Sequence, residues 1–177
     1  METIHLTDFL MLDWMHTQRN SVLDLFFRSI TWAGSLYLLI PAVGLLLALL
    51  YSFGKLKEMQ LLAGSMTAAV IAVHAVKLFF RRPRPDIHPG VISIPVDWSF
   101  PSAHSAQIAT FCLCIGLIAM RNFPAPWAWL TILAAIALTL GVGVSRVYLQ
   151  VHYPTDVAAG IFLGIIVVTA ADLLIKL

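Results

Sequence analysis

The chain has 177 residues, of which 60% are hydrophobic and only 11% are charged, and its formal net charge is +2 at pH 7. A soluble domain usually carries about twice that share of charged residues, so we expect most of this chain to lie in lipid. Its basic residues are few and scattered, which excludes the electrostatic footprint of a nucleic-acid-binding protein.

The first 28 residues are expected to lie at the membrane interface. They mix large apolar side chains with charged ones such as Asp8 and Asp13, a composition typical of an amphipathic helix on the bilayer surface. Ser21 followed by Asp24 predicts a helix start within this segment. The acidic beginning lacks the basic region of a secretory signal, so we do not expect cleavage.

Five apolar stretches follow, and each can supply the roughly 17–25 residues that a spanning helix needs. They lie at 29–54, at 59–76, within 98–120, within 122–145, and from about 157 to the C-terminus. The sequence therefore predicts an all-α membrane protein of one domain, residues 1–177. In it, residues 1–28 form an interfacial helical segment and residues 29–177 form a bundle of about five transmembrane helices.

Two features inside the spans predict packing rather than chemistry. Gly160 and Gly164 form a GxxxG pattern, which permits another helix to approach closely. Cys112 and Cys114 lie two residues apart, about 200° around an α-helix, so we expect neither a disulfide nor a shared metal.

The number of spans also sorts the polar segments between the two faces of the membrane. With five spans, segments 81–101 and 146–156 share one face with the N-terminal segment. Loops 54–58 and 121–126 lie on the other face. Most of the unusual polar residues therefore gather at one membrane face, which makes that face the candidate site.

The first polar cluster is KLFFRRPRPD, residues 77–86. Lys77 and Arg84 are seven residues apart, so both could point the same way if the helix persists. Pro83 and Pro85 favour a helix end before Arg84. Taken alone, the cluster is equally consistent with basic side chains that snorkel towards lipid headgroups.

The second cluster is SFPSAHSA, residues 99–106. Pro101 or Ser102 can open a helix, and a helix start offers free backbone N–H groups and a positive dipole end to a phosphate. Ser102 adds a hydroxyl donor, and His104 adds a titratable group two residues later. Taken alone, the same residues describe a plain helix cap with an interfacial histidine.

The third cluster is SRVYLQVHYPTD, residues 145–156, in which Arg146 follows the fourth span. His152 and Asp156 are four residues apart, and Tyr153-Pro154 predicts that the last helix begins between them. An aspartate at that distance could accept a hydrogen bond from the imidazole, fix its tautomer and leave the other ring nitrogen free to act. Taken alone, HxxxD also fits a membrane-edge loop with a capping aspartate.

Together the three clusters contain what phosphoryl transfer requires. Lysine and arginine side chains can hold the charge on the phosphoryl oxygens, and a histidine can attack or donate a proton. No set of Asp, Glu and His with metal-ligand spacing accompanies them, so we expect no metal or other cofactor. These residues alone leave open which histidine is the nucleophile, although Asp156 favours His152.

The same residues match a known pattern of three motifs, K-x6-RP, PSGH and SR-x5-H-x3-D. They read here as Lys77 to Arg84-Pro85, as PSAH at 101–104, and as Ser145-Arg146 with His152 and Asp156. In this the chain resembles the type 2 phosphatidic acid phosphatase superfamily of integral membrane lipid phosphatases. One departure is Ala103 in place of the motif glycine, a methyl group that would crowd backbone approach to a phosphate.

The resemblance implies a metal-independent lipid phosphatase that works through a phosphohistidine. His152 would attack phosphorus, Asp156 would orient His152, and His104 would protonate the leaving oxygen. The residues implied in binding the phosphoryl oxygens are Lys77, Arg84, Ser102, Ala103 and Arg146. Arg81 and Arg82 lie outside the motif, and we expect them to grip a second phosphate or an anionic lipid.

The resemblance also implies a substrate class and a location. Candidate substrates are undecaprenyl diphosphate, phosphatidylglycerophosphate, phosphatidic acid and the lipid A phosphate. The charges on the two faces do not decide the orientation, but the resemblance implies a bacterial inner membrane with a periplasmic or extracellular active face. The alternatives are a phosphotransferase with a lipid acceptor, and a non-enzymatic lipid-binding or transport protein. The intact histidines and aspartate argue against the latter.

Overall fold

The computed structural model describes residues 2–88, 90–93 and 95–176. The regular structure in these ranges is helical. Its elements are α1 (Glu2–Thr17), α2 (Ser21–Ile30), a 3-10 turn η1 (Thr31–Gly34), α3 (Leu36–Ser52), α4 (Leu56–Phe80), α5 (Ala103–Asn122), α6 (Ala125–Tyr148) and α7 (Pro154–Lys176).

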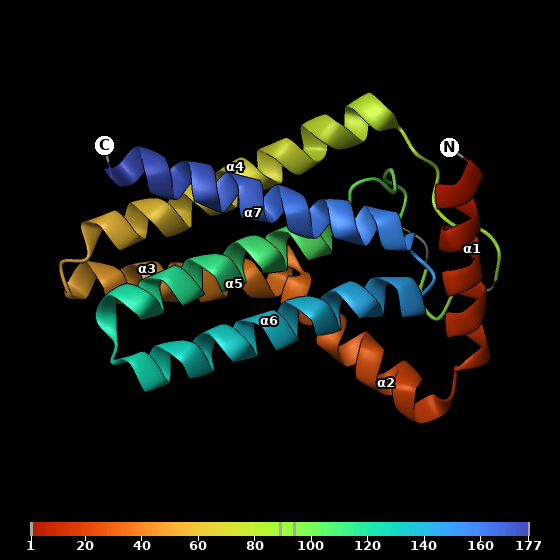
Figure 1. Cartoon of the computed structure of the whole chain (residues 1–177), viewed down its shortest axis with the longest axis horizontal. Helices are drawn as coiled ribbons and strands as arrows, with labels where there is room; N and C mark the ends of the chain where they lie inside the picture. The colour runs from red at the N-terminus through yellow and green to blue at the C-terminus, as the bar shows by residue number, and fades with distance from the viewer. Residues whose placement is uncertain (1, 89, 94, 177) are drawn as a thin grey trace.

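The predicted membrane bundle is confirmed. Four of the described helices, α4 to α7, are long and apolar enough to cross a bilayer. A fifth span is formed if α2 with η1 and α3 count as one span with a 47° bend. In Figure 1 helices α3 to α7 run side by side, and α1 crosses one end of the bundle.

The helix start predicted at Ser21 is confirmed: α2 begins there, after Asn20, whose side chain accepts hydrogen bonds from the backbone N–H groups of Val22 and Leu23. One predicted boundary is wrong. The second span continues beyond 59–76 to Phe80, where the next residue takes a left-handed conformation with φ of 44°. Hydropathy ended this span too early because the charged Lys77 lies inside the helix, where it is buried among polar partners.

Helix α5 forms the centre of the bundle and packs against α4, α6 and α7. Small residues on α7 allow the closest of these approaches. A Cβ atom added to Gly160 would lie 2.5 Å from the backbone oxygen of Ser102, and one added to Gly164 would lie 2.9 Å from that of Ala106. The GxxxG pattern therefore brings the start of α5 against the first turns of α7.

The apolar core lies around this contact. It contains Leu61 and Leu62 of α4, Ile108 of α5, Val142 of α6 and Val168 of α7. Cys112 and Cys114 are buried in it as free thiols, which confirms that they form no disulfide.

The α5–α7 contact yields a stability prediction. Gly160→Ala places a methyl group against backbone, which must shift, so we expect a loss of about 1–3 kcal/mol, the usual cost of overpacking. The measurement is the thermal aggregation temperature of the detergent-solubilised protein. Gly64→Ala is the matched control, because a Cβ atom at Gly64 meets nothing within 4 Å. Equal stability of the two variants would contradict the close approach.

Candidate active site

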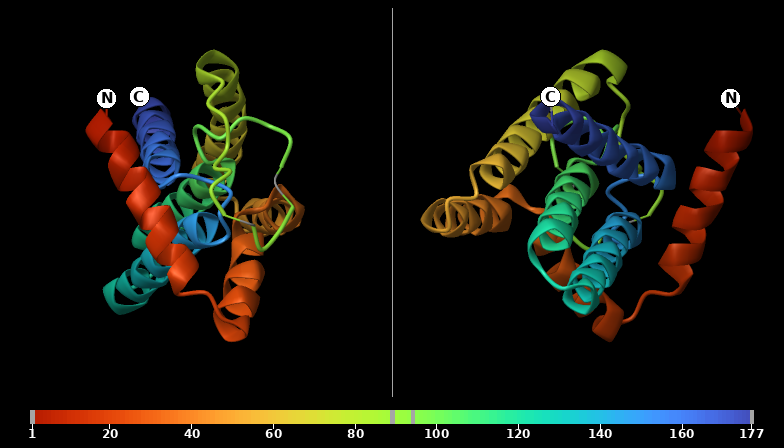
Figure 2. Two further views of the ribbon diagram at one scale, coloured as in Figure 1. Left: turned by 90° about the vertical axis from the view of Figure 1, so that its right-hand side faces the viewer. Right: turned by 60° about the vertical axis from the view of Figure 1, so that its left-hand side comes forward.

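The predicted site residues lie at one end of the bundle. The described parts of the connection between α4 and α5 (81–88, 90–93 and 95–102) lie at this end, as do the short loop between α6 and α7 and helix α1 (Figure 2). Lys77 lies in the last turn of α4, His104 at the start of α5 and Arg146 in the last turn of α6. His152 precedes α7 and Asp156 lies in its first turn, as the sequence predicted.

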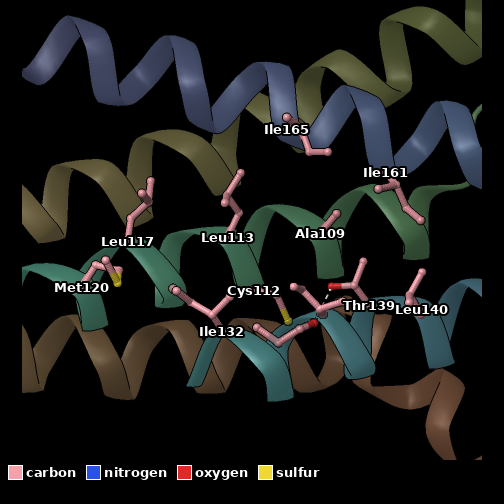
Figure 3. Close-up of a pocket in the computed structure, with 13 residues that line it drawn as sticks. Ala109, Cys112, Leu113, Leu117, Met120, Ile132, Thr139, Leu140, Ile161 and Ile165 are labelled. Atoms are coloured by element: carbon pink, nitrogen blue, oxygen red, sulfur yellow. Dashed lines mark hydrogen bonds between the residues drawn. The ribbon is translucent and has the colours of Figure 1, made fainter. Parts of the chain in front are cut away.

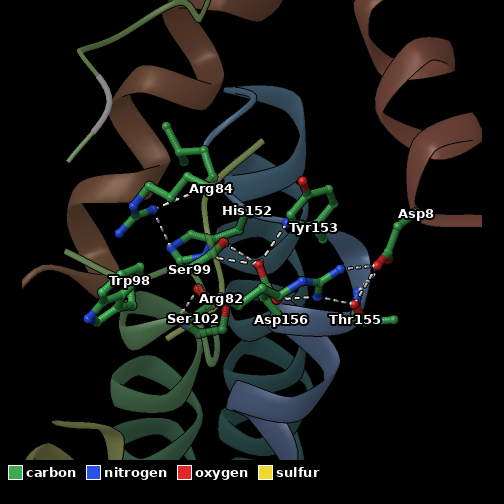
Figure 4. Close-up of polar contacts among 12 residues, drawn as sticks. Asp8, Arg82, Arg84, Trp98, Ser99, Ser102, His152, Tyr153, Thr155 and Asp156 are labelled. Carbon is green, nitrogen blue, oxygen red and sulfur yellow. Dashed lines mark hydrogen bonds and ion pairs between the residues drawn. The ribbon is translucent and has the colours of Figure 1, made fainter. Parts of the chain in front are cut away.

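His152 is held between a guanidinium and a carboxylate (Figure 4). A terminal nitrogen of Arg84 donates to Nε2 of the imidazole at 3.0 Å. The opposite nitrogen, Nδ1, lies 3.5 Å from Oδ2 of Asp156 and 3.4 Å from the hydroxyl of Ser99. This network assigns the proton to Nδ1 and leaves the Nε2 lone pair beside the arginine.

The charge state of His152 follows from its burial. Its side chain is buried, and burial lowers the pKa of His152 to about 3 although Asp156 opposes the shift. The charge of Arg84 adds to the lowering. The imidazole is therefore neutral at physiological pH, which is the state that a nitrogen nucleophile requires.

Asp156 is oriented by several donors. Its Oδ2 accepts from the hydroxyl of Ser99 at 2.5 Å and from the backbone N–H of Tyr153 at 3.0 Å. The carboxylate is fully buried. Because both carboxylate oxygens accept hydrogen bonds, Oδ1 from Arg82 and Oδ2 from Ser99 and Tyr153, the aspartate can hold the imidazole in one orientation.

Lys77 and Arg84 converge on a carboxylate that sequence reasoning missed. Oδ2 of Asp97 lies 3.0 Å from Nζ of Lys77, and Oδ1 lies 2.5 Å from a terminal nitrogen of Arg84. Partial burial acts to raise the pKa of Asp97, but hydrogen bonds and charge from the two cations outweigh it and lower that pKa to about 2. The two side chains predicted to bind phosphoryl oxygens therefore already hold one anion.

The second motif forms the start of α5. Ser102 is its N-cap, and its buried hydroxyl accepts from the backbone N–H and the hydroxyl of Ser105. Its own backbone N–H donates to the carbonyl oxygen of Asp156 at 3.0 Å, which ties the α5 start to α7. Ala103 is the first residue of α5 and is partly exposed, and His104 follows in the same turn.

Arg146 is buried, and one terminal nitrogen donates to the hydroxyl of Thr31 at 2.6 Å. Its Nε is buried without a partner among the described residues. An unpaired buried donor is costly, and a phosphoryl oxygen would satisfy it.

The expectation that Arg82 grips a second phosphate is wrong. Arg82 turns towards the protein interior, where it pairs with Asp8 of α1 and with Asp156. Arg81 is exposed, and its Nε donates to the carbonyl oxygen of Leu78. Sequence reasoning also missed the role of Asp8, although on a helix Asp8 shares its face with the buried Leu12.

Two further observations delimit the site. Across residues 2–88, 90–93 and 95–176, no three His, Cys, Asp or Glu side chains come together as a metal site.

A groove of about 310 Å³ between α5, α6 and α7 (Figure 3) is lined almost entirely by apolar side chains such as Leu113 and Ile161. This groove holds no catalytic group, so the chemistry belongs to the polar end of the bundle.

Comparison with known proteins supports this assignment. Residues 59–175 match the model of the PAP2 superfamily. A decaprenylphosphoryl-5-phosphoribose phosphatase of Mycobacterium tuberculosis is 36% identical over 113 residues, which are 62% of this chain and 56% of that protein. The chain thus spans little more than half the length of this relative. Phosphatidylglycerophosphatase B of Bacillus subtilis is 29% identical over 139 residues, 77% of this chain and 68% of that protein.

The fold also matches a solved structure. A transmembrane PAP2-type phosphatidylglycerolphosphate phosphatase from Bacillus subtilis superposes with a TM-score of 0.91, over 99% of this chain and 88% of that one. Its sequence identity is 24%, so this likeness concerns the fold.

The position of Asp97 predicts competition between its carboxylate and a phosphate. Asp97→Asn removes the resident negative charge, so we expect KM for a lipid phosphate to fall about two- to tenfold, as for a partly exposed ion pair. The measurement is steady-state phosphate release at neutral pH. Asp86→Asn, an exposed carboxylate of the same loop, is the matched control and should leave KM unchanged. A raised KM in Asp97→Asn would show that Asp97 supports binding.

Proposed function

Because this chain belongs to the PAP2 superfamily, we propose that it is a multi-pass membrane lipid phosphatase, with residues 1–177 forming one catalytic domain. It hydrolyses a phosphate monoester or diphosphate of a lipid through a phosphohistidine on His152. The observation that carries the proposal is the placement of the buried His152, whose Nε2 faces Arg84 while Asp156 lies beside its Nδ1.

The reaction has two steps. In the first, the Nε2 lone pair of His152 forms a bond to phosphorus, the bond from phosphorus to the oxygen of the leaving lipid (or, in a diphosphate, of the leaving lipid phosphate) breaks, and His104 gives that oxygen a proton. In the second, water attacks the phosphohistidine, His104 takes a proton from the water, and inorganic phosphate leaves as the P–N bond breaks.

The cations supply electrostatic stabilisation in both steps. Lys77, Arg84 and Arg146 bind the phosphoryl oxygens, whose charge must be held during in-line transfer. The N-terminus of α5 at Ser102 and Ala103 adds backbone N–H groups and the positive end of a helix dipole. Fixed guanidinium and ammonium groups thus carry the role that Mg²⁺ has in other phosphoryl transfer enzymes.

A lipid substrate is supported by a second apolar groove, of about 500 Å³, between α3 and α4. It begins at Leu36, two residues after Gly34, and Gly34 lies against the backbone of His104. Candidate substrates are undecaprenyl diphosphate, phosphatidylglycerophosphate and phosphatidic acid. The alternatives are a lipid A phosphatase, and a phosphotransferase that passes the phosphoryl group to a lipid acceptor.

We place the protein in a bacterial cytoplasmic membrane, with its active site on the periplasmic or extracellular face. The support for this face is the family resemblance.

The reaction is tested by phosphate release from a panel of these lipids in detergent micelles containing EDTA. We expect activity in EDTA and a loss of at least about a thousandfold in His152→Ala, as for removal of a nucleophile. His74→Ala is the matched control, because His74 lies exposed on α4. Unchanged release by His152→Ala would exclude this mechanism, and labelled phosphate found on a second lipid would indicate transfer.

The orientation is tested by fusions at the end of α7, which lies at the opposite end of the bundle from the site (Figure 1). We expect a green fluorescent protein fused there to fluoresce in the cytoplasm, and alkaline phosphatase fused there to be inactive. The reverse result would place the active site in the cytoplasm.

A further inference from the structure

A buried ionic network joins the N-terminal helix to the catalytic aspartate (Figure 4). One terminal nitrogen of Arg82 lies 2.6 Å from Oδ1 of Asp156 and 2.7 Å from the hydroxyl of Thr155. The other terminal nitrogen lies 2.8 Å from Oδ2 of Asp8. A single guanidinium thus bridges two carboxylates from elements far apart in the sequence.

Both carboxylates are withdrawn from water. Asp156 is 0% exposed and Asp8 is 1% exposed. Asp8 also accepts from the backbone N–H of Thr155 at 3.0 Å and from its hydroxyl at 2.6 Å. Buried charges of one sign are tolerated only with a cation between them, and the planar fork of arginine can bind an acceptor at each terminal nitrogen.

The two oxygens of Asp156 have separate partners. Oδ2 serves the catalytic side, where it accepts from Ser99 and lies nearest to Nδ1 of His152. Oδ1 faces away from His152 and binds Arg82. Arg82 also lies over the ring of Tyr153, with its guanidinium carbon 4.0 Å from the ring centroid. Its contacts are therefore with the residues that orient the nucleophile.

We propose that Arg82 and Asp8 are positioning residues for phosphohistidine chemistry: Arg82 keeps Asp156 ionised and aligned with His152, and Asp8 of α1 holds Arg82 in place. This inference rests on the proposed function. It assigns the N-terminal helix a part in catalysis that lies outside the three sequence motifs.

The physical reason is the charge that develops on His152. When Nε2 bonds to phosphorus, the imidazole that keeps its Nδ1 proton becomes cationic, and an ionised Asp156 stabilises it. Without Arg82, Asp8 and Asp156 form a buried pair of like charges, so one of them takes up a proton at a higher pH than before. The charged or titratable groups around this pair are Lys77 on α4, Arg82 and Arg84 on the α4–α5 loop, and His152 and Tyr153 before α7.

The first test is Arg82→Gln. We expect kcat at pH 7 to fall about ten- to hundredfold, as when the partner that orients a working histidine is lost, with KM within about threefold of wild type. Asp156 is active when ionised, and the loss of Arg82 favours its protonated form. The kcat of the variant should therefore rise with pH. In a plot of kcat against pH, the fall in activity on the acid side (the acid limb) should lie at higher pH for the variant than for wild type.

The second test adds Asp8→Asn to Arg82→Gln. Removing the second carboxylate relieves the repulsion, so the acid limb should move back to lower pH and kcat should partly recover. Arg82→Lys keeps one positive charge without the planar guanidinium, and its kcat should lie between those of Arg82→Gln and wild type. Arg81→Gln is the matched control, because Arg81 is the exposed neighbour, and it should change kcat less than twofold.

The nitrogen chemical shifts of His152 give a readout that does not depend on turnover. We expect wild type at pH 7 to carry its proton on Nδ1, and Arg82→Gln to show a mixture of the two neutral tautomers. Size-exclusion chromatography establishes whether each variant is folded. If Arg82→Gln does not fold, Asp8→Asn alone is measured, and its kcat should fall severalfold at constant KM.

Several results would overturn the inference. One is a raised KM with unchanged kcat in Arg82→Gln, which would make Arg82 a substrate-binding residue. Others are an unshifted acid limb, an absence of rescue by Asp8→Asn, or a single tautomer of His152 in both proteins. Wild type that releases no phosphate from any lipid would instead refute the proposed function, and the tautomer measurement would still decide the role of Arg82.

Discussion

The carboxylate of Asp156 is the group on which the polar end of the bundle depends. It is 0% exposed at the edge of an apolar bundle, where an unpartnered charge would be strongly unfavourable. Its donors come from the α4–α5 loop, through Arg82 and Ser99, and from the residues just before α7, through the backbone of Tyr153. The loop must therefore fold back over α7, and this path brings the guanidinium of Arg84 to Nε2 of His152.

Close helix packing makes this arrangement possible. The start of α5 can donate its Ser102 N–H to the carbonyl oxygen of Asp156 only because Gly160 leaves room beside it. Helix α5 also packs along α6, whose last turn carries Arg146. Packing of small residues in the bundle thus sets the distances among groups that belong to separate motifs.

The sequence predicted those features that depend on residues close together in the chain. Apolar runs predicted the spans, and the spacing of His152 and Asp156 with Tyr153-Pro154 between them predicted the start of α7. The first 34 residues were harder, because the bend between α2 and α3 depends on tertiary contacts that no hydropathy pattern contains. Lys77 interrupted the predicted second span, although its ammonium donates to the carbonyl oxygen of Trp98 and pairs with Asp97.

The partners of charged residues were the least predictable part of the site. KLFFRRPRPD offers three nearby arginines, and only the path of an irregular loop decides which of them reaches Asp156 and which stays exposed. Asp8 did carry a signal, since an acidic residue on the same helical face as Leu12 requires a buried cation. The identity of that cation, 74 residues away in sequence, could be known only from the fold.

The groove between α3 and α4 bears on how turnover should be measured. It lies on the outside of the bundle, where Ile40 and Ile71 on its walls are exposed. A lipid tail that enters there stays in the bilayer throughout the reaction cycle. The encounter is then a two-dimensional diffusion problem, and the effective substrate concentration is a mole fraction of membrane lipid rather than a molarity. Diluting the lipid phosphate with inert phospholipid would slow such an enzyme even when the bulk amounts of enzyme and substrate are unchanged.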